Sequence, residues 1–299
     1  MAESLTISSV LKRIKEQLEQ AKLRNPQLEA EMIVSEALGI SRPEIYLELD
    51  KTIPGSALKK IRAWVKARSE RKPFAYIIRK AWFREIELEV NNSVLIPRPE
   101  TELLTEQALR LIRSEPTIEK ILDLGTGSGA IILSLAFELK NFARNLKFFA
   151  SDISKPALEM AKKNARKLGL SKKITFCKGD LFQPFSRHKF HLIVCNPPYI
   201  PQAQLRSLMP EIKRYEPEIA LNGGVDGLEL VQKIINQAPR HLYPDAWLLM
   251  EIGLNQAKRL KKYLGAEMAL KEVVKDYNRV DRIAIFQKRQ EQGFARILT

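Results

Sequence analysis

The tetrapeptide Asn196-Pro197-Pro198-Tyr199 follows the short apolar run 192–195. Two consecutive prolines remove two backbone N–H donors and fix two φ angles, so the Pro197 carbonyl is expected to lack a strand partner. The Asn196 side chain brings a second carbonyl oxygen to the same place. Two acceptors on a stiff backbone suit a planar –NH2 group, and the Tyr199 ring can pack on its flat face. The sequence therefore predicts a substrate site made of Asn196, Pro197, Pro198 and Tyr199, with Asn196, Pro197 and Tyr199 as the catalytic residues.

Such a site would solve a definite chemical problem. An amide or exocyclic amine nitrogen is a poor nucleophile because its lone pair is delocalised. Two acceptors that hold both N–H bonds in fixed directions can aim that lone pair at an electrophilic methyl group, so orientation and desolvation supply most of the acceleration. No strong base is needed at the start, because the proton becomes acidic once the methyl is transferred. The alternative is an ordinary turn from a strand into a loop.

A glycine-rich loop, Gly125-Thr126-Gly127-Ser128-Gly129, follows the apolar run 120–124. Glycine permits positive φ and a close approach of a ligand to the backbone. A dinucleotide site uses the spacing G-x-G-x-x-G, with the pyrophosphate at the helix N-terminus. This loop has the spacing G-x-G-x-G and is preceded by Asp123, which would disfavour a pyrophosphate and could hold a cation such as the ammonium of an amino acid.

A second acidic residue, Asp152, follows the apolar run 146–151. A carboxylate at the end of the second strand can accept both hydroxyls of a ribose. The alternative is a structural turn in which Asp152 caps the helix that starts near Lys155. Together, the loop, Asp123 and Asp152 favour S-adenosylmethionine over a nicotinamide dinucleotide as the cofactor.

Strands and helices alternate from residue 100 onward. The predicted helices are 100–113, 129–140 and 155–168, and the predicted strands are 120–124, 146–151, 174–177, 192–195 and 247–252, with a final strand pair at 270–275 and 282–287. This alternation predicts an α/β fold with a parallel, doubly wound sheet. Apolar residues at spacings of three and four predict a helical domain over 1–75, and alternation around 83–90 predicts a hairpin. We therefore expect a helical substrate-docking domain at 1–75, a β-hairpin linker at 76–98 and a catalytic domain at 99–299.

The composition is that of a soluble globular protein. The 299 residues are 45% hydrophobic, and the longest apolar stretch, Ala130–Phe137, is far shorter than the ~20 residues of a membrane span. The first residues do not resemble a secretory signal, and two cysteines fit a reducing compartment, so we expect a cytoplasmic protein. None of the three histidines pairs with cysteines or carboxylates at the spacing of metal ligands, so no metal site is expected.

The net charge of +15 is unevenly distributed. Residues 51–80 hold ten basic side chains and one acidic side chain, and residues 138–191 hold thirteen basic and four acidic ones, a net charge of +9 each. Such clusters can attract RNA, DNA or a ribosomal particle. The alternative is that they form well-solvated helix faces.

With these motifs the sequence resembles the HemK/PrmC family, the release factor glutamine methyltransferases. The matching stretches run from about residue 73 to 287 and include the segments 94–102, 123–129, 151–154, 179–182, 196–201, 215–217, 220–221, 223–228 and 251–253. The tetrapeptide alone is shared with adenine methyltransferases, whereas Ile96-Pro97-Arg98-Pro99-Glu100-Thr101 and the Gly-Gly-x-Asp-Gly-Leu stretch at 223–228 are more selective. Arg79 stands where the family usually has glycine, and the segment before Asp281-Arg282 lacks the family's usual glycine.

The resemblance implies a Rossmann-like methyltransferase sheet, with a helical N-terminal domain joined to it by the hairpin. It implies that the loop Gly125, Thr126, Gly127, Ser128 and Gly129 lines the methionine part of S-adenosylmethionine, that Asp152 holds its ribose, that Asp180 and Leu181 flank its adenine, and that Asn196 borders both cofactor and substrate. Arg98 and Glu100 would lie near the mouth of the site. The implied substrate is the glutamine of the Gly-Gly-Gln motif of class 1 peptide chain release factors.

Beyond the release factor, we expect a monomer that needs no membrane, and for which contact with nucleic acid or the ribosome is possible but not required. The alternatives are a methyltransferase that acts on an amino group of a nucleic acid, such as adenine, a nicotinamide-dependent oxidoreductase, and a catalytically silent RNA-binding protein of Rossmann-like fold.

Overall fold

A computed structural model describes residues 5–290 and divides the chain into two compact units. The first unit comprises the residues up to Arg79 together with Met209–Tyr215, and the second comprises Lys80–Leu208 and the chain from Glu216 onward. The short segment 209–215 thus lies within the sequence of the second unit but packs with the first. The division at residues 75 and 98 into docking domain, linker and catalytic domain stays a prediction about function.

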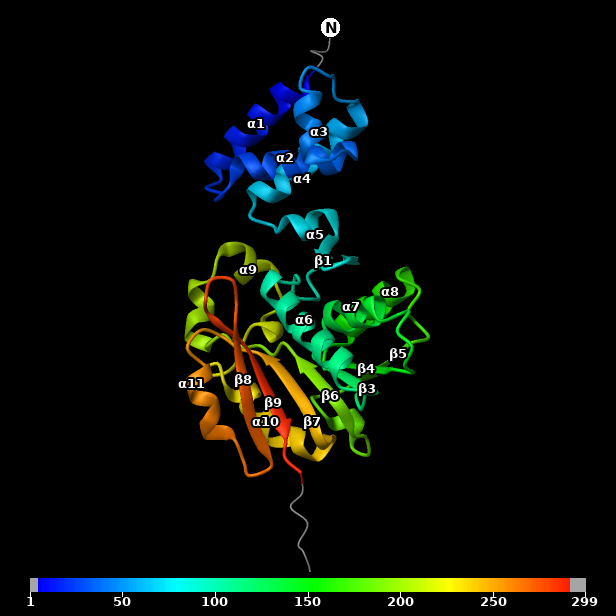
Figure 1. Cartoon of the computed structure of the whole chain (residues 1–299). Helices are drawn as coiled ribbons and strands as arrows, with labels where there is room; N and C mark the ends of the chain where they lie inside the picture. Colours follow the sequence, from blue (N-terminus) through cyan, green and yellow to red (C-terminus); the bar gives the residue numbers. More distant parts are fainter. Residues whose placement is uncertain (1–4, 291–299) are drawn as a thin grey trace, which may run out of the picture. The chain divides into compact units, whose positions relative to one another are not determined.

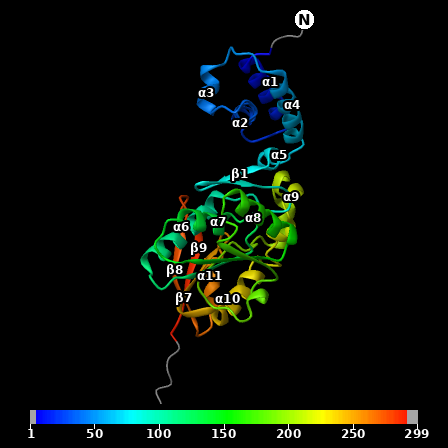
Figure 2. The ribbon, with the colours of Figure 1, turned by 90° about the vertical axis from the view of Figure 1, so that its right-hand side faces the viewer.

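The first unit is built from helices around one apolar core. Its elements are α1 (Ile7–Gln20), α2 (Pro26–Leu38), α3 (Arg42–Leu47), α4 (Gly55–Ser69), α5 (Phe74–Ile78) and α9 (Pro210–Tyr215). Local signals delimit them: Ser41 and Glu44 form a capping box at the start of α3, and Gly39 ends α2 in the left-handed region. Figure 2 shows α1, α2, α3 and α4 gathered together, and their buried apolar faces include Leu18, Ile33 and Ile61.

Ion pairs hold α9 against the rest of this unit. The Arg68 side chain is only 7% exposed, and its guanidinium donates to both carboxylate oxygens of Glu29, at 2.5 and 2.8 Å. Arg68 also reaches Glu211 of α9 at 3.1 Å, and Arg71 reaches the other oxygen of Glu211 at 2.8 Å. The Tyr215 hydroxyl donates to the backbone carbonyl of Glu70. Two basic residues of the segment 51–80, Arg68 and Arg71, therefore form ion pairs inside the protein.

The second unit begins with a hairpin of β1 (Lys80–Phe83) and β2 (Ile86–Glu89) and contains a seven-stranded sheet. The sheet strands are β3 (Lys120–Leu124), β4 (Lys147–Asp152), β5 (Ile174–Lys178), β6 (Phe190–Cys195), β7 (Leu242–Glu251), β8 (Met268–Lys275) and β9 (Asp281–Lys288), in the spatial order β5-β4-β3-β6-β7-β9-β8. The five strands from β5 to β7 are parallel, and β9 pairs antiparallel with both β7 and β8.

Helices cover both faces of this sheet (Figure 1). The first face packs against α6 (Pro99–Ser114), α7 (Ala130–Glu138) and α8 (Lys155–Lys167), and the second packs against α10 (Glu229–His241) and α11 (Ala257–Leu260). Alternate residues of a strand divide between the two cores: Ile121 belongs to the first and Leu122 to the second. Short 3₁₀ helices occupy Gln183–Phe185, Gln202–Ser207, Glu218–Ala220 and Lys261–Tyr263.

The predicted α/β fold is confirmed, and every predicted strand of the sheet is present with bounds that shift by a few residues. The parallel arrangement holds for five of the seven strands, whereas the final pair adds an antiparallel edge. After β3 the chain continues to β4 and β5 on one side, and after β6 it continues to β7 on the other. The carboxyl ends of β3 and β6 therefore meet at the topological switch point, where such sheets bind ligands.

Arg79 and Arg279 lie in the two segments where the sequence departs from the family pattern, and both have a positive φ. Arg79 ends α5 at φ 60°, and Arg279 lies in the turn between β8 and β9 at φ 62°. Both values lie in the left-handed region that glycine adopts without strain. Both arginines thus adopt a backbone conformation that favours glycine.

Within residues 5–290, the helices are too short or too polar to cross a membrane.

Candidate active site

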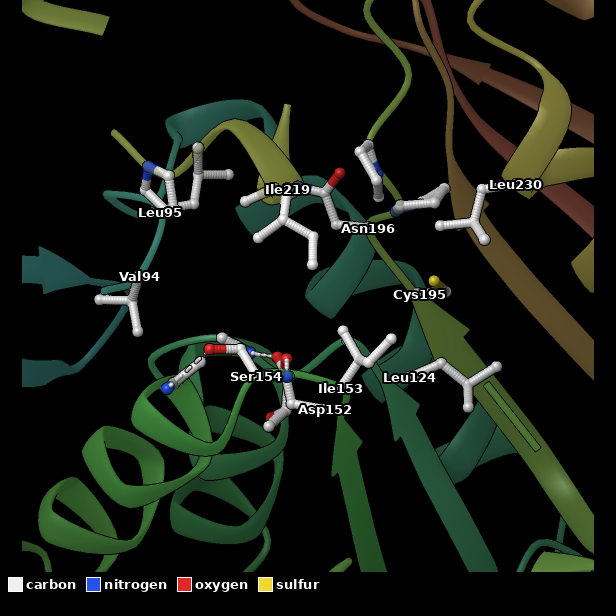
Figure 3. A pocket seen from close by; sticks show the side chains of 18 of the residues that line it. Val94, Leu95, Leu124, Asp152, Ile153, Ser154, Cys195, Asn196, Ile219 and Leu230 are labelled. Atoms are coloured by element: carbon white, nitrogen blue, oxygen red, sulfur yellow. Dashed lines mark hydrogen bonds between the residues drawn. The ribbon is translucent and has the colours of Figure 1, made fainter. Parts of the chain in front are cut away.

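A cavity of about 660 Å³ lies at the carboxyl ends of β3, β4 and β6, within the second unit. Its size falls in the range of small-molecule sites, ~300–1,000 Å³. Figure 3 shows Asp152, Ile153 and Ser154 on one side of it and Val94, Leu95 and Ile219 on the facing side. The register pairs Leu124 with Cys195, so the glycine loop and the Asn-Pro-Pro-Tyr segment begin side by side. Both motifs therefore open onto one cavity.

The backbone fixes the shape of the glycine loop. The N–H groups of Gly125 and Thr126 both donate to the Ser151 carbonyl at 2.9 Å, which ties the loop to the end of β4. Gly125 and Gly127 have φ of +70° and +56°, and no heavy atom lies within 4 Å of the place where a Cβ would stand. Both line the cavity. A side chain at either position would be strained and would project into open space that a ligand can fill.

Asp152 joins the loop to the helix that follows β4. Its Oδ2 accepts from the Gly127 N–H at 2.9 Å, and its Oδ1 accepts from the Ser154 N–H at 2.8 Å. Burial raises the pKa of Asp152 above its ordinary value, although these backbone donors oppose the rise. Each oxygen keeps a lone pair for a further donor, and Asp152 lines the cavity. The geometry suits a pair of ligand hydroxyls.

Asp123 lies behind the loop instead of on the cavity wall. Its side chain is fully buried, and its Oδ2 accepts from the Thr126 hydroxyl at 2.7 Å. Burial raises the pKa of Asp123 to about 7. Asp123 is absent from the residues that line the cavity, so in this structure it braces the loop through Thr126 and does not itself face a ligand.

The second motif is anchored by a buried glutamate. Asn196 donates from Nδ2 to the Thr101 hydroxyl at 2.9 Å, and that hydroxyl donates to Oε2 of Glu251 at 2.6 Å. The Tyr199 hydroxyl donates to Oε1 of the same carboxylate at 3.0 Å. Burial, with the Glu251 carboxylate, raises the pKa of the Tyr199 phenol, so it stays a donor. Glu251 is 1% exposed, and burial raises its pKa as well.

Cys195 lines the cavity directly before Asn196. A thiolate there would be a stronger nucleophile than an amide nitrogen. Burial raises the pKa of the Cys195 thiol well above its ordinary value, and the nearby Asp123 and Glu251 carboxylates raise it further. The thiol is therefore neutral at physiological pH and a weak nucleophile.

An ion pair joins two segments that wall the cavity. Arg98, in the proline-rich segment, donates to Oε1 of Glu216 at 2.5 Å. The side chain of Glu216 is 1% exposed, and burial raises its pKa although Arg98 opposes this. Arg98 lines the cavity, as do the three residues directly after Glu216, Pro217 to Ile219. Glu100 does not reach the cavity wall.

Ten of the twelve residues predicted for the site line this one cavity: Gly125, Thr126, Gly127, Ser128, Asp152, Asp180, Leu181, Asn196, Pro197 and Pro198. Gly129 is the N-cap of α7 and lies beside Leu133, and the Tyr199 hydroxyl is turned to Glu251, so neither residue is on the wall. The roles of all twelve in binding and catalysis stay predictions. Thr101 and Glu251 were not predicted as site residues. Both stand in stretches that match the family, which is the one signal that could have found them.

The residues present fit S-adenosylmethionine. The open Cβ positions at Gly125 and Gly127 leave room for the amino acid part, and the two-oxygen acceptor of Asp152 suits the ribose. Ile153 and Leu181 supply apolar surface on the same wall for a base. Across residues 5–290, no cluster of three or more His, Cys, Asp or Glu side chains is placed to hold a metal ion.

Family models match both parts of the chain. A model described as the PrmC N-terminal domain matches residues 9–78, and a model described as a methyltransferase domain matches residues 118–284.

Curated relatives match along nearly the whole chain. A release factor glutamine methyltransferase of Geobacter sulfurreducens is 38% identical, over 86% of this chain and 87% of the relative. The protein of the same name from Thermodesulfovibrio yellowstonii is 39% identical over 87% and 92%. That from Moorella thermoacetica is 34% identical over 96% of this chain and 100% of its own length.

Among solved structures, the catalytic domain of hMettl16, in complex with the MAT2A 3'UTR hairpin 6, aligns with a TM-score of 0.52. The alignment covers 79% of this chain and 82% of that chain at 17% sequence identity. At this identity the likeness shows the fold alone.

Proposed function

Because this chain belongs to the family of release factor glutamine methyltransferases, we propose that it methylates the glutamine of the Gly-Gly-Gln motif in class 1 peptide chain release factors. The methyl group comes from S-adenosylmethionine and goes to the side-chain amide nitrogen. The observation that carries the proposal is that Asn196 and Pro197 line the same cavity as the glycine loop and Asp152. One cavity thus brings acceptors for an amide next to a site for the cofactor.

When bound, the cofactor supplies a methyl group made electrophilic by a positively charged sulfur. Asp152 would hold the ribose by accepting hydrogen bonds from its hydroxyls, and the loop 125–129 would line the amino acid part. Asp180 and Leu181 would flank the base. Each of these residues except Gly129 lines the cavity.

Asn196 and Pro197 hold the substrate amide. The side-chain oxygen of Asn196 and the backbone carbonyl of Pro197 each accept one N–H of the glutamine, which fixes the plane of the –NH2 group and aims its lone pair. Pro198 keeps this backbone stiff. Tyr199 lies behind the cavity wall, because its hydroxyl donates to Glu251. It therefore acts by supporting the residues that hold the amide. As the nitrogen–carbon bond formed, the bond between that carbon and the positively charged sulfur would break, and its electron pair would stay on the sulfur, which becomes neutral. The nitrogen, positively charged at that point, would release one of its hydrogens as a proton to water.

The partner protein determines where this reaction takes place. Release factors work on the ribosome, so the proposed reaction takes place in the cytoplasm and requires no membrane. The enzyme is proposed to act as a monomer, with contact to nucleic acid or the ribosome possible but not required.

The test is transfer of labelled methyl from S-adenosylmethionine to a purified class 1 release factor. A parallel sample carries alanine in place of the Gly-Gly-Gln glutamine. We expect label on the first protein alone, and we expect Asn196→Ala to reduce turnover at least about a hundredfold. Cofactor affinity, measured by calorimetry, should change far less than turnover.

RNA and DNA serve as competing acceptors in the same assay. The proposal would be refuted if the enzyme binds the cofactor and labels nucleic acid but labels neither form of the release factor. That outcome would indicate a nucleic-acid methyltransferase. Full activity of the Asn196→Ala variant would show that Asn196 does not take part in the reaction.

A further inference from the structure

Three side chains from distant parts of the sequence form a buried chain of hydrogen bonds at the cavity. Glu251 ends β7, Thr101 lies in the first turn of α6, and Asn196 follows β6. Glu251 is 1% exposed and Thr101 is 4% exposed. The oxygen–oxygen distance from Thr101 to Glu251 is 2.6 Å, and the nitrogen–oxygen distance from Asn196 to Thr101 is 2.9 Å.

With Glu251 ionised, the donors and acceptors along this chain have only one order. The carboxylate then has no hydrogen to give, and both of its oxygens accept, Oε2 from Thr101 and Oε1 from Tyr199. The single hydroxyl hydrogen of Thr101 is therefore used on Glu251. The Thr101 oxygen can then only accept from Asn196, so it must be met by Nδ2. The other end of the amide, Oδ1, is left for the cavity that Asn196 lines.

We propose that Glu251 and Thr101 are positioning residues that hold the Asn196 amide with its oxygen toward the substrate, and that they thereby make the site select an amide over a carboxylate. This inference rests on the proposed function, because it concerns how the same site reads its glutamine.

Orientation decides this selection because the two ends of an asparagine amide have nearly the same shape and opposite chemistry. With Oδ1 in the cavity, Asn196 accepts from a glutamine –NH2 and repels a glutamate carboxylate. With the amide turned by 180°, Nδ2 would repel the glutamine hydrogens and donate to the carboxylate. Nothing in the shape of the asparagine itself prevents the turn, so a directional partner is needed.

The first experiment removes the Thr101 hydroxyl without changing side-chain volume. Thr101→Val leaves Nδ2 without its acceptor, and we expect kcat/KM for methyl transfer to fall about tenfold to a hundredfold. Thr101→Ser keeps a hydroxyl and should restore most of the activity. Thr105→Val is the matched control, since Thr105 lies one turn further along α6, is also buried, and donates from its hydroxyl to the Thr101 carbonyl.

The decisive readout is selectivity, which loss of packing would not alter. Dissociation constants are measured for a release factor with its Gly-Gly-Gln glutamine and for one with glutamate at that position. The wild type and Thr105→Val should prefer glutamine, and Thr101→Val should lose about tenfold or more of this preference. An unchanged preference in Thr101→Val would overturn the proposal.

Glu251→Gln tests the first link of the chain. The glutamine side chain has the same size but can donate to Thr101, which frees the Thr101 hydrogen to bond Oδ1 of Asn196 and allows the reversed amide. We expect the same loss of preference as in Thr101→Val. A Glu251→Gln variant with the wild-type preference would show that Glu251 does not set the direction.

A third measurement does not depend on the release factor. In protein labelled with ¹⁵N-asparagine, the Asn196 side-chain amide signals are assigned by their absence in Asn196→Asp. They should shift in Thr101→Val and Glu251→Gln and stay in place in Thr105→Val. If these shifts occur while the wild type neither methylates nor binds a release factor, the proposed function fails and the orientation of Asn196 stands. If the wild type is active and the signals do not shift, the inference fails alone.

Discussion

Asp123 and Asp152 end neighbouring strands of one sheet, but their surroundings give them different tasks. Asp152 accepts from two backbone N–H groups, which oppose the rise that burial causes in its pKa, and it lines the cavity, where a ligand can reach it. Asp123 has one hydroxyl partner at Oδ2, and its Oδ1 has no partner among the described residues. Desolvation therefore dominates and raises the pKa of Asp123 to about 7.

The raised pKa of Asp123 predicts how stability depends on pH. Between the ordinary pKa of 3.8 and the folded-state value of about 7, the folded protein holds a proton that the unfolded chain has released. Stability therefore falls as pH rises through this window and levels off above it. Asp123→Asn keeps an acceptor for Thr126 and removes the titration. The free energy of unfolding of the variant, minus that of the wild type, should grow by about 1.4 kcal/mol per pH unit between pH 5 and 7.

Urea unfolding at pH 5, 6, 7 and 8 checks this expectation. Tryptophan fluorescence can be confined to the second unit when Trp64 and Trp82 are replaced by phenylalanine, which leaves Trp247 of β7 as the reporter. Trp82 is 70% exposed, so its replacement costs little. A constant difference between variant and wild type across these pH values would contradict a buried, protonated Asp123.

Among single residues, the sequence identifies those that can be recognised from their immediate neighbours in the chain. The glycine loop and the two prolines are recognisable because few residue types adopt those backbones, and they fall at the ends of strands with clear apolar runs. The bond from Thr101 to Glu251 spans 150 positions, and no spacing rule reaches that far. The inward position of Asp123 was also out of reach, because burial depends on what packs against the strand.

At the level of the elements, three loops beside the cavity contact one another through their backbones. A backbone bridge joins Ile200 to Asn222, and the Gly223 N–H donates to the Ile200 carbonyl at 2.9 Å. The Gln256 side chain donates to the carbonyls of Tyr199 and Gly227, both at 3.0 Å. The segment that follows the Asn-Pro-Pro-Tyr tetrapeptide is therefore fixed by two other loops.

The surroundings of Gly223 predict that this contact does not tolerate a larger side chain. A Cβ at Gly223 would stand 2.8 Å from Cα of Tyr199 and 2.9 Å from Cα of Gly227, and both obstacles are backbone atoms. Gly223→Ala must therefore displace the tetrapeptide. We expect kcat to fall by about a hundredfold, the cost of a shift on the order of 1 Å at reacting groups. Steady-state methylation kinetics measure this effect.

Gly265→Ala supplies the control, because no heavy atom lies within 4 Å of the place where a Cβ of residue 265 would stand, and Gly265 lacks a positive φ. It should leave kcat within about twofold. If Gly223→Ala has the same kcat as Gly265→Ala, the close contact with Tyr199 does not constrain the active site.

Element prediction succeeded where periodicity is strong and failed where packing decides. Strand β3 matches its apolar run at both ends, whereas β7 begins five residues before the predicted Trp247 because it continues through polar, exposed positions. Helix α9 could not be assigned to the first unit from its sequence. Its place there depends on Glu211, whose partners Arg68 and Arg71 lie about 140 positions earlier.

For the molecule as a whole, the net charge is +15, and its basic side chains are of two kinds. Some form ion pairs within the protein, and others face solvent. Within 51–80, Arg68 and Arg71 are bound to Glu29 and Glu211. Other basic residues of α4 are exposed: Lys59, Lys60, Arg62 and Lys66. An exposed cluster on one helix suits a partner surface of opposite charge, and this gives the predicted docking role of the first unit a defined set of residues.

Reversal of these four charges to glutamate, which spares Arg68 and Arg71, should weaken release factor binding about tenfold or more at low ionic strength. The dissociation constant for S-adenosylmethionine and the kcat at saturating release factor should stay within about twofold, because neither depends on docking. The control reverses four exposed basic residues of 138–191, namely Lys155, Arg166, Lys172 and Lys173, and so changes the net charge equally. An equal loss of release factor binding in both variants would mean that net charge attracts the partner and α4 does not dock it. Equal losses of release factor and cofactor binding in the α4 variant would mean that the substitutions damage the fold.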